Sequence, residues 1–300
     1  MSATSTSGGV EGMLRSAGLD PDEVRDLLRA TLREDLGDHG DLTSMATVPE
    51  DAVLDVQWTA RQAGVVAGLP VLAALVEEVL GPEAPLELVR SDGDLVGPGD
   101  VLATLRAPAR PVLGLERTSL NLLGHLSGVA TLTRAWVDAV EGTGARIRDT
   151  RKTMPLLRSL QKYAVRCGGG VNHRAGLYDA VLVKDNHVAA AGRVGAALDA
   201  VRATHPPPGP VVQVEVDDLR QLCEALAHGA TQVLLDNMPP AVLREAVSVC
   251  RSTTPGVLLE ASGGLTLDNA REVAETGVDF LAVGALTHSA PQLDIGLDVA

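Results

Sequence analysis

Aromatic residues, cysteines and lysines are scarce in this sequence. Phe, Trp and Tyr together make up 2% of the 300 residues, so Leu, Val and Ala must fill the core. The longest uncharged apolar stretch, residues 63–76, has about 14 residues and contains Pro70, whereas a membrane span needs about 20 residues. The polar N-terminal residues lack the apolar segment of a secretory signal. We therefore expect no membrane partner and a cytoplasmic protein.

The three cysteines, Cys167, Cys223 and Cys250, lie far apart and form no CxxC pair. An odd number excludes a complete disulfide framework and is typical of a reducing compartment. We expect each of them to be a small, buried apolar residue.

Positive charge is also scarce, but it is concentrated. The net charge of −14 argues against a nucleic-acid partner. Residues 145–187, however, hold nine of the 25 Lys and Arg residues and only three acids, which makes this window +6 and the remainder −20. A basic window in an acidic protein indicates a focused site for a small polyanion.

Lysine usage narrows the site further. The chain has 22 arginines but only three lysines, Lys152, Lys162 and Lys184, all inside the basic window. A compact ammonium group does not substitute for a guanidinium group. We interpret each retained lysine as a residue whose role requires lysine.

The first half of the chain has the pattern of a small α+β unit. Asp20-Pro21 predicts a helix start, with the helix ending near residue 36. Alternation predicts a strand over 53–60, and helices are expected over 69–80 and 111–140. Glycine-rich turns join short strands over 91–105. The segment 34–44, with its acids and one histidine, is either a metal loop or a glycine-rich turn, and the turn is favoured.

From residue 145 a second rhythm begins. Short apolar runs alternate with helical segments, at 146–150, 181–184, 211–216, 233–236, 257–260 and 280–283. This is the βα repeat of a parallel sheet, and the number of units favours a barrel.

In α/β barrels the active site lies at the carboxyl ends of the strands. Reading those ends in chain order gives cations first, then carboxylates, then glycines: Arg151, Lys152, Lys184, Glu215, Asp236, Ser262-Gly263-Gly264 and Gly284. The glycines would let backbone N–H groups approach a phosphate; the alternative is simple turn glycines. Glu215 and Asp236 would hold sugar hydroxyls or Mg²⁺ and stabilise developing positive charge; the alternative is helix capping by Asp217 and Asp236.

A glycine-rich loop, residues 167–174, ends in His173-Arg174 and lacks the pattern of a Walker loop. With Arg151, Lys152 and Lys184, these two residues could grip one or two carboxylates through charge-assisted hydrogen bonds. His187 is interpreted as part of a helix start.

An ordered set of motifs resembles one family. The set is ERTSLN from Glu116, DTRKT from Asp149, GGG from Gly168 followed by His173-Arg174, KDNH from Lys184, EV at Glu215, LDN from Leu235 and EASGG from Glu260. It is similar, over residues 25–298, to quinolinate phosphoribosyltransferase, also called nicotinate-nucleotide pyrophosphorylase (carboxylating).

The resemblance implies a type II phosphoribosyltransferase architecture within the α/β class. We expect a flexible tail over 1–24, an α/β sandwich domain over 25–128, an incomplete α/β (TIM-like) barrel over 129–288, and a C-terminal segment over 289–300 that returns to the first domain. It also implies a homodimer, or a higher oligomer, with a shared active site. The family reaction joins quinolinate to phosphoribosyl pyrophosphate with Mg²⁺ and yields nicotinate mononucleotide, pyrophosphate and CO₂, in de novo NAD biosynthesis.

The family's site residues carry over by similarity. Quinolinate is assigned to Arg117 of the neighbouring subunit and to Thr150, Arg151, His173, Arg174 and Lys184. Phosphoribosyl pyrophosphate is assigned to Lys152, Glu215, Asp236, Ser262, Gly263, Gly264, Val283, Gly284 and Ala285. Lys152, Lys184, Glu215 and Asp236 are the expected catalytic residues, and Glu215 and Asp236 would hold Mg²⁺ directly or through water.

Three other functions are compatible with the residues. One is a transferase of the same fold that uses nicotinate or another acceptor. Another is a barrel lyase or aldolase that uses Lys184 as an imine, which borohydride would trap. The third is a non-catalytic anion-binding module, which would bind a phosphosugar without releasing pyrophosphate.

Overall fold

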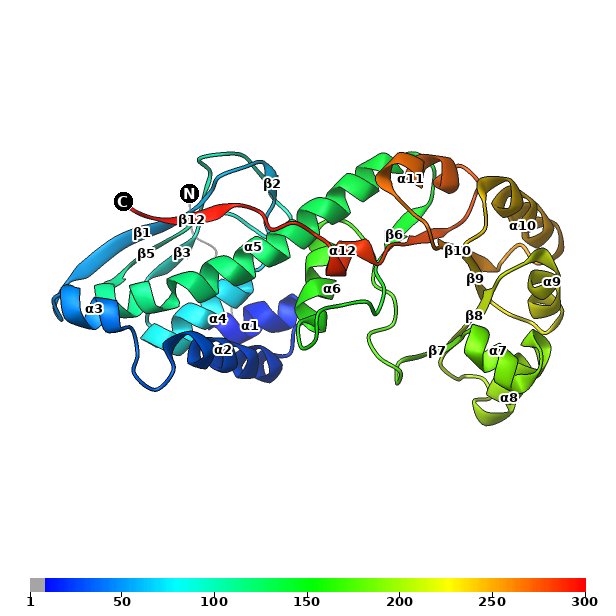
Figure 1. Cartoon of the computed structure of the whole chain (residues 1–300), viewed down its shortest axis with the longest axis horizontal. Helices are drawn as coiled ribbons and strands as arrows, with labels where there is room; N and C mark the ends of the chain where they lie inside the picture. Colours follow the sequence, from blue (N-terminus) through cyan, green and yellow to red (C-terminus); the bar gives the residue numbers. More distant parts are fainter. Residues whose placement is uncertain (1–8) are drawn as a thin grey trace. The chain divides into compact units, whose positions relative to one another are not determined.

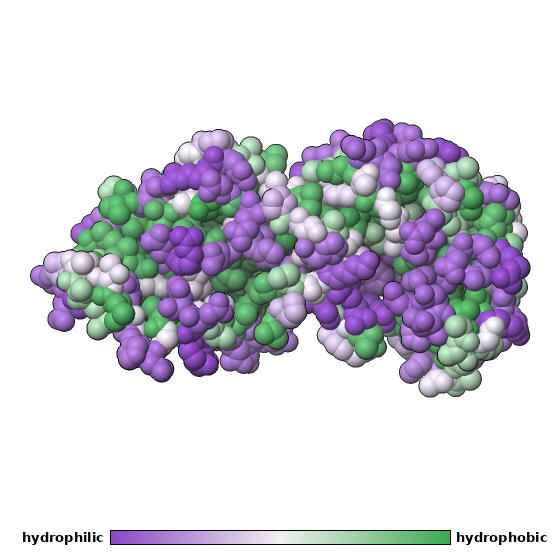
Figure 2. Space-filling model, viewed as in Figure 1, coloured by the Kyte–Doolittle hydropathy of each residue, from purple (hydrophilic) through white to green (hydrophobic). Residues whose placement is uncertain are grey.

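The computed structural model describes residues 9–300, which form two compact units (Figure 1). Unit 1 comprises the chain up to Arg134 together with Met154–Gly169 and Ser289–Ala300. Unit 2 comprises Ala135–Thr153 and Gly170–His288. No helix among residues 9–300 is long and apolar enough to cross a membrane, and the face in Figure 2 shows hydrophilic and hydrophobic residues interspersed.

Unit 1 is an antiparallel sheet with helices packed beside it. Its helices are α1 (Gly9–Ser16), α2 (Pro21–Leu36), α3 (Leu42–Thr47), α4 (Leu69–Leu80), most of α5 (Ala109–Ala139) and α6 (Arg158–Cys167). Its strands are β1 (Val53–Ala60), β2 (Gly64–Val65), β3 (Leu86–Leu88), β4 (Leu95–Val96), β5 (Val101–Pro108) and β12 (Ile295–Val299). The main sheet has the order β12-β1-β5-β3, and β2 pairs with β4.

The core of unit 1 explains how so few aromatic residues suffice. Trp58 on β1 is fully buried, and its indole N–H donates to Ser119 Oγ on α5 at 2.9 Å. Aliphatic side chains of α2 and α4, such as Leu28 and Leu72, fill the rest. Burial of this apolar surface is the main stabilising contribution.

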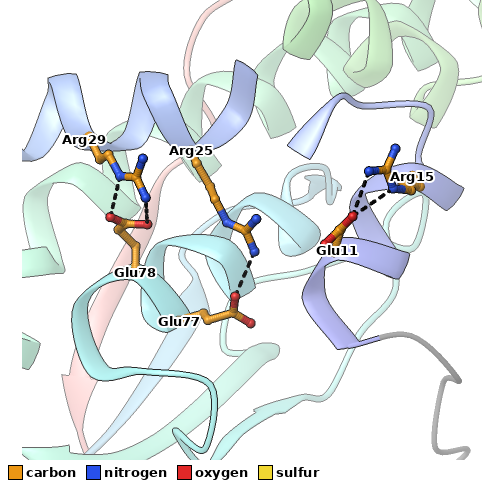
Figure 3. Close-up of polar contacts among 6 residues, drawn as sticks. All are labelled: Glu11, Arg15, Arg25, Arg29, Glu77 and Glu78. Atoms are coloured by element: carbon orange, nitrogen blue, oxygen red, sulfur yellow. Dashed lines mark hydrogen bonds and ion pairs between the residues drawn. The ribbon is translucent and has the colours of Figure 1, made fainter. Parts of the chain in front are cut away.

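Ion pairs lie at the edge of this helix layer (Figure 3). Arg29 Nε is 2.7 Å from Glu78 Oε1, and Arg25 Nη2 is 3.0 Å from Glu77 Oε1, so two pairs link α2 to α4. Solvent-accessible pairs of this kind contribute little to stability; they orient helices whose apolar faces supply the energy.

The expected tail over residues 1–24 is wrong for the part that the structure describes. Residues 9–16 form α1 and α2 begins at Pro21, with Leu14 and Leu19 buried. Leu14 gives this polar segment an apolar contact, and α1 packs on α4. Residues 1–8 lie outside the described residues.

The unit boundaries also differ from the expected domains. The first unit extends to Arg134 rather than to residue 128, and it includes α6, which the expected boundaries place in the barrel. Apolar residues of α6 such as Leu160 and Val165 are buried, and two polar contacts join the helix to unit 1: Tyr163 donates to Asp92, and Arg166 donates to the carbonyl of Ala17. The C-terminal strand β12 pairs with β1 in antiparallel register, with Ile295 opposite Ala60.

Unit 2 is an open parallel barrel. Its strands are β6 (Arg146–Arg148), β7 (Ala180–Val183), β8 (Val211–Val216), β9 (Gln232–Asp236), β10 (Leu258–Ser262) and β11 (Phe280–Ala282). They form one parallel sheet of order β6-β11-β10-β9-β8-β7, which confirms the predicted βα repeat. The ends of this sheet, β6 and β7, are not neighbours in the described sheet; beyond β6 lies the glycine-rich loop, where Val171 bridges to Arg148.

The helices of unit 2 are α7 (Asp185–Ala191), α8 (Val194–Thr204), α9 (Leu219–Ala227), α10 (Pro240–Thr253), α11 (Leu267–Ala274) and α12 (Ala285–His288). Helices α7 to α11 lie around the outside of the curved sheet (Figure 1). Fully buried Val214, Leu235 and Leu259 belong to the central strands. Strand ends on such a packed sheet are rigid platforms for a site.

The structure also shows the environment of the glycine-rich segment 34–44 and of the three cysteines. Asp41, in the glycine-rich segment 34–44, caps α3 by accepting the N–H groups of Thr43 and Ser44, as the turn interpretation favours. Among the cysteines Cys250 is buried, but Cys223 is exposed and Cys167 is intermediate, so the prediction of buried cysteines is wrong for Cys223.

Candidate active site

The strand ends of unit 2 bring the predicted cations, carboxylates and glycines to one edge of the sheet. Parallel strands share the direction of their carboxyl ends, and the sheet order places their loops in spatial sequence. From one end of the sheet to the other, the loops supply Thr150, Arg151 and Lys152 after β6, Val283 and Gly284 after β11, Ser262-Gly263-Gly264 at β10, Asp236 at β9, Glu215 at β8 and Lys184 after β7.

Arg151 and Arg174 form a pair of like charges. The pKa of Arg174 is lowered, first by burial and then by the charge of Arg151. Arg174 Nη1 donates to the Ala180 carbonyl at 3.0 Å, whereas the buried Arg151 Nε has no hydrogen-bond partner among the described residues. An unpaired buried donor is costly. A bound anion would satisfy it and offset the repulsion between the two guanidinium groups.

Lys184 and Glu215 form an ion pair at the opposite end of the sheet. Lys184 Nζ is 3.4 Å from Glu215 Oε2, and their side chains are 48% and 12% exposed. Burial raises the pKa of Glu215; Lys184 lowers it, and the nearby charge of Asp236 raises it again. The site therefore sets one accessible ammonium group beside two coupled carboxylates.

Asp236 does not cap a helix, so the alternative interpretation of this residue is wrong. Helix α10 begins at Pro240, and its N-cap is Pro239. Asp236 instead accepts the Asn237 side-chain N–H at 2.6 Å. Helix α9 is capped by Asp218 rather than Asp217. Asp236 is thus available to a ligand.

The glycines after β10 are required by the backbone. Gly263 and Gly264 have φ of 84° and 64°, which side-chain-bearing residues rarely adopt. A Cβ on Gly263 would lie 2.1 Å from Asn237 Oδ1. Because the two residues of this turn have no side chains, their backbone N–H groups can approach an anion closely.

Lys152 lies beside the other glycine loop. Its Cδ would be 3.1 Å from a Cβ on Gly284, and its carbonyl accepts from Thr287 Oγ1 at 2.8 Å. Thr150 Oγ1 accepts the Lys152 N–H at 3.0 Å, which fixes the loop after β6. The Val283 N–H donates to the Arg148 carbonyl at 2.8 Å, so this amide is already paired within the sheet, and Ala285 begins α12. The assignment of Val283 and Ala285 to phosphoribosyl pyrophosphate stays a prediction.

His173 is partly buried, with 11% of its side chain exposed, and both of its ring nitrogens have hydrogen-bond partners within the chain. Nδ1 accepts the Arg174 N–H at 2.7 Å, and Nε2 is 2.8 Å from Gln213 Oε1. The assignment of His173 to quinolinate binding stays a prediction. His187 behaves as interpreted: its Nδ1 accepts the Lys184 N–H at 2.9 Å at the start of α7.

Arg117 lies on an exposed position of α5 in unit 1. Its part in the site stays a prediction.

Sequence reasoning missed supporting residues. Asp149 is fully buried and accepts the His173 N–H at 2.7 Å and Asn172 Nδ2 at 2.6 Å. An acid at the end of a strand, directly before the basic residues, was the available signal. Asn237, the last residue of the LDN motif, and His288 border the two glycine loops, and sequence reasoning assigned a role to neither of them.

The fold and the site define a class: an α/β-barrel protein whose strand ends place cations opposite carboxylates and bare backbone amides, for anionic substrates. Family models give the particular assignment. "Quinolinate phosphoribosyl transferase, N-terminal domain" matches residues 41–127, and the C-terminal domain of the same family matches residues 129–298. The chain belongs to the quinolinate phosphoribosyltransferase family and is a pentosyltransferase enzyme.

Individual relatives agree. A Mycobacterium leprae protein named nicotinate-nucleotide pyrophosphorylase [carboxylating] is 53% identical over 93% of this chain and 98% of its own length. A Bacillus subtilis protein with a probable assignment of the same name is 40% identical over 92% and 93%. The crystal structure of nicotinate-nucleotide pyrophosphorylase from Ehrlichia chaffeensis has a TM-score of 0.85 and 37% identity, covering 92% of this chain and 98% of that one.

Proposed function

We propose that the barrel site transfers the phosphoribosyl group of phosphoribosyl pyrophosphate to the ring nitrogen of quinolinate. The products are nicotinate mononucleotide, pyrophosphate and CO₂, and the reaction belongs to NAD biosynthesis. One observation carries the proposal: Arg151 and Arg174 repel each other, and a buried Arg151 donor lacks a partner among the described residues. A dianionic acceptor supplies the missing charge. The names of the relatives support the same reaction.

The acceptor is held by cations from several loops. Arg151 and Arg174 bind its carboxylates, with Lys184 and Thr150 beside them, and Arg117 reaches in from the partner subunit. Guanidinium groups suit planar carboxylates because they form paired, charge-assisted hydrogen bonds. Two carboxylates need more cations than one, which favours quinolinate over nicotinate.

The donor is held at the other strand ends. The amides of Gly263, Gly264 and Gly284 bind the 5′-phosphate, and Lys152 lies beside the phosphoribosyl pyrophosphate. Backbone N–H groups bring partial positive charge without a side chain in the way. This arrangement sets the anomeric carbon against the ring nitrogen, and positioning of this kind lowers the barrier substantially.

The transfer is a displacement at the anomeric carbon. The ring nitrogen attacks with its lone pair, and the bond to pyrophosphate breaks with its electrons going to the leaving oxygen. Positive charge develops on the sugar, and Glu215 and Asp236 stabilise it. The C2–CO₂ bond then breaks, the pyridinium ring accepts the electron pair, and C2 takes up a proton. No covalent enzyme intermediate is needed, so Lys184 stays an ammonium paired with Glu215.

Glu215 and Asp236 are the residues that would hold Mg²⁺. Residues 9–300 contain no cluster of three or more His, Cys, Asp or Glu suited to a metal ion. Two carboxylates fit a magnesium ion because this ion is bound through one or two carboxylates plus substrate phosphates. When bound, Mg²⁺ neutralises charge on the pyrophosphate oxygens.

The assembly is a homodimer whose two sites each take Arg117 from the partner subunit. Arg117 is exposed on α5, so it is free to meet another chain. The location is cytoplasmic; three cysteines without a disulfide support a reducing compartment.

The test is an activity assay on the purified chain. With quinolinate, phosphoribosyl pyrophosphate and Mg²⁺ we expect nicotinate mononucleotide, pyrophosphate and CO₂ in equal amounts by mass spectrometry and coupled detection. Turnover with nicotinate in place of quinolinate, without CO₂, would instead show a transferase for a monoanionic acceptor. Phosphoribosyl pyrophosphate bound without pyrophosphate release would show an anion-binding module.

A further inference from the structure

Polar residues form one layer inside the barrel of unit 2. Arg148 on β6, Glu260 on β10 and Gln213 on β8 come from every second strand of the sheet order. In α/β barrels alternate strands supply the interior layers, and bulky aliphatic residues usually fill them. Here Glu260 is 1% and Gln213 is 3% exposed. Burial of such groups is costly unless they serve one another or a neighbour.

The charges within this layer are balanced. Arg148 Nη1 is 2.6 Å from Glu260 Oε2, and the Arg148 guanidinium lies 4.2 Å from the centre of the Phe280 ring. The second oxygen, Glu260 Oε1, has no hydrogen bond among the described residues. It faces His173 Nε2 at 3.6 Å.

His173 contacts both remaining members of the layer. Its Nε2 is 2.8 Å from Gln213 Oε1 and 3.6 Å from Glu260 Oε1. Both oxygens are acceptors, so Nε2 carries the proton and donates it. Its Nδ1 accepts the Arg174 N–H at 2.7 Å and therefore has no proton. If Nδ1 also carried a proton, its N–H would point at the Arg174 N–H, and two donors would face each other with no acceptor between them.

We propose that Gln213 and Glu260 are positioning residues that hold His173 as a neutral, Nε2-protonated imidazole, and that His173 in turn fixes the backbone of Arg174. The proposal rests on the proposed function, because Arg174 matters through its grip on the acceptor's carboxylate. It gives His173 a positioning role between the polar layer of the barrel and the backbone of Arg174. Asp149 completes the support by accepting the His173 N–H at 2.7 Å.

Charged groups surround the imidazole from several elements. Glu260 and Arg148 lie on its barrel side as a neutral pair, and Arg174 and Asp149 flank its backbone. The carboxylate of Glu260 alone would favour an imidazolium. The bond from the Arg174 N–H to Nδ1 opposes it, and the pairing of Glu260 with Arg148 weakens that pull.

Gln213→Leu removes the acceptor and keeps the volume. We expect the KM for quinolinate to rise about tenfold, as for the loss of one buried hydrogen bond that orients a charged ligand. The KM for phosphoribosyl pyrophosphate should stay within about twofold, because Arg174 does not bind the donor. Gln213→Asn, which withdraws the amide by one methylene, serves if Gln213→Leu does not fold.

The matched control is Gln232→Leu. Gln232 lies opposite Gln213 in the register of β8 and β9 but lines a cavity with the first residues of β8. Its quinolinate KM should equal that of the wild type. A merely structural loss would raise both KM values or lower thermal stability in both variants alike.

The protonation state is read directly by ¹⁵N NMR of the histidine ring. The signal is assigned by its loss in His173→Asn, and the full-length protein is used at pH 7. We expect one protonated and one bare nitrogen, with and without quinolinate, and loss of this fixed tautomer in Gln213→Leu. Two protonated nitrogens, or an unchanged quinolinate KM in a folded Gln213 variant, would overturn the proposal. If the proposed function failed, the wild type would form no product, whereas the NMR result would stand.

Discussion

Lys184 is the residue on which acceptor binding can be tested most simply. Its ammonium is half-exposed and 3.4 Å from Glu215, so it can meet a carboxylate of the substrate. Lys184→Ala should weaken quinolinate binding by about 1.5–3 kcal/mol, the range for a charge-assisted hydrogen bond. Isothermal titration calorimetry measures this directly.

The control for that variant is Arg244→Ala. Arg244 is an exposed cation whose contact with Glu272 at 3.7 Å is a surface pair. It should leave quinolinate affinity unchanged. Equal affinities for Lys184→Ala and the wild type would remove Lys184 from the site, and borohydride trapping of Lys184 would support imine chemistry instead.

Glu215 predicts an acid limit to the rate. Burial raises its pKa above the ordinary value of 4.5, while Lys184 opposes the shift and Asp236 adds to it. As the pH falls, Glu215 takes up a proton earlier than an exposed glutamate and loses the charge that we propose stabilises the transition state. kcat should therefore fall on the acid side in the wild type, and Glu215→Gln should be slow and flat across the same range.

The same shift has a consequence for stability. A carboxyl group with a raised folded-state pKa stabilises the fold below its unfolded pKa, and this contribution is lost as the pH rises through the folded pKa. At pH 7 the ionised Glu215 thus lowers stability, and Glu215→Gln should melt no lower than the wild type. A melting temperature clearly below that of the wild type would show that Glu215 is structural.

For single residues, the sequence predicted which kinds of side chain lie at the strand ends better than it predicted what each one contacts. The scarcity of lysine identified Lys152 and Lys184, which lie at barrel strand ends. The same argument fails to separate them from Lys162, a buried residue of α6 in unit 1. His173 belongs to a recognisable motif, but its partners could not be predicted. Gln213 and Glu260 lie on strands that are 40 and 87 residues further along the chain.

Among the elements, the turn after β10 is the most sensitive to change. Gly263→Ala forces a positive φ on alanine and sets its Cβ 2.1 Å from Asn237 Oδ1. We expect a loss of about 1–3 kcal/mol in the free energy of unfolding and weaker binding of phosphoribosyl pyrophosphate. Chemical denaturation and titration measure the two effects.

Gly256→Ala is the matched control. Its Cβ meets nothing within 4 Å, and Gly256 has no positive φ. This variant should be as stable as the wild type. If Gly263→Ala were also neutral for donor binding, the turn would not be the phosphate cradle.

Helices and strands with a clear hydrophobic periodicity could be predicted from the sequence. The compact unit in which each of them packs could not. The helix over 21–36 and the strand over 53–60 were predicted with the observed ends, because proline, glycine and alternation mark them. Helix α6 was assigned to the barrel since its amphipathic pattern shows an apolar face and not what covers it. Helix α1 was missed because Leu14 is its one buried residue.

For the whole molecule, the proposed shared site makes a complementation prediction. Arg117→Ala and Lys184→Ala should each lose activity, while heterodimers that combine them should recover it. In such a dimer one site carries both changes and the other carries neither. Co-expression with two different affinity tags isolates the heterodimer for assay. Inactive, verified heterodimers would contradict a site built from two chains.

The charge pattern was the most informative property at this scale. The +6 window over 145–187 in a chain of −14 indicates a site for a small anion, and it includes the loops that carry Arg151, Arg174 and Lys184. It also includes Arg158, Lys162 and Arg166 of α6, which lie in unit 1. The geometry inside that window was not predictable, because one sequence does not show which cations lie close enough to repel.

A crystal structure of the full chain with quinolinate tests the central claim most directly. We predict a pyridine ring at the carboxyl ends of the barrel strands, one carboxylate within hydrogen-bond distance of the Arg151 and Arg174 guanidinium groups, and Lys184 beside the ring. His173 should keep its bonds to Gln213 and the Arg174 N–H. Quinolinate bound elsewhere, or Arg151, Arg174 and Lys184 turned apart with no common ligand, would contradict the account.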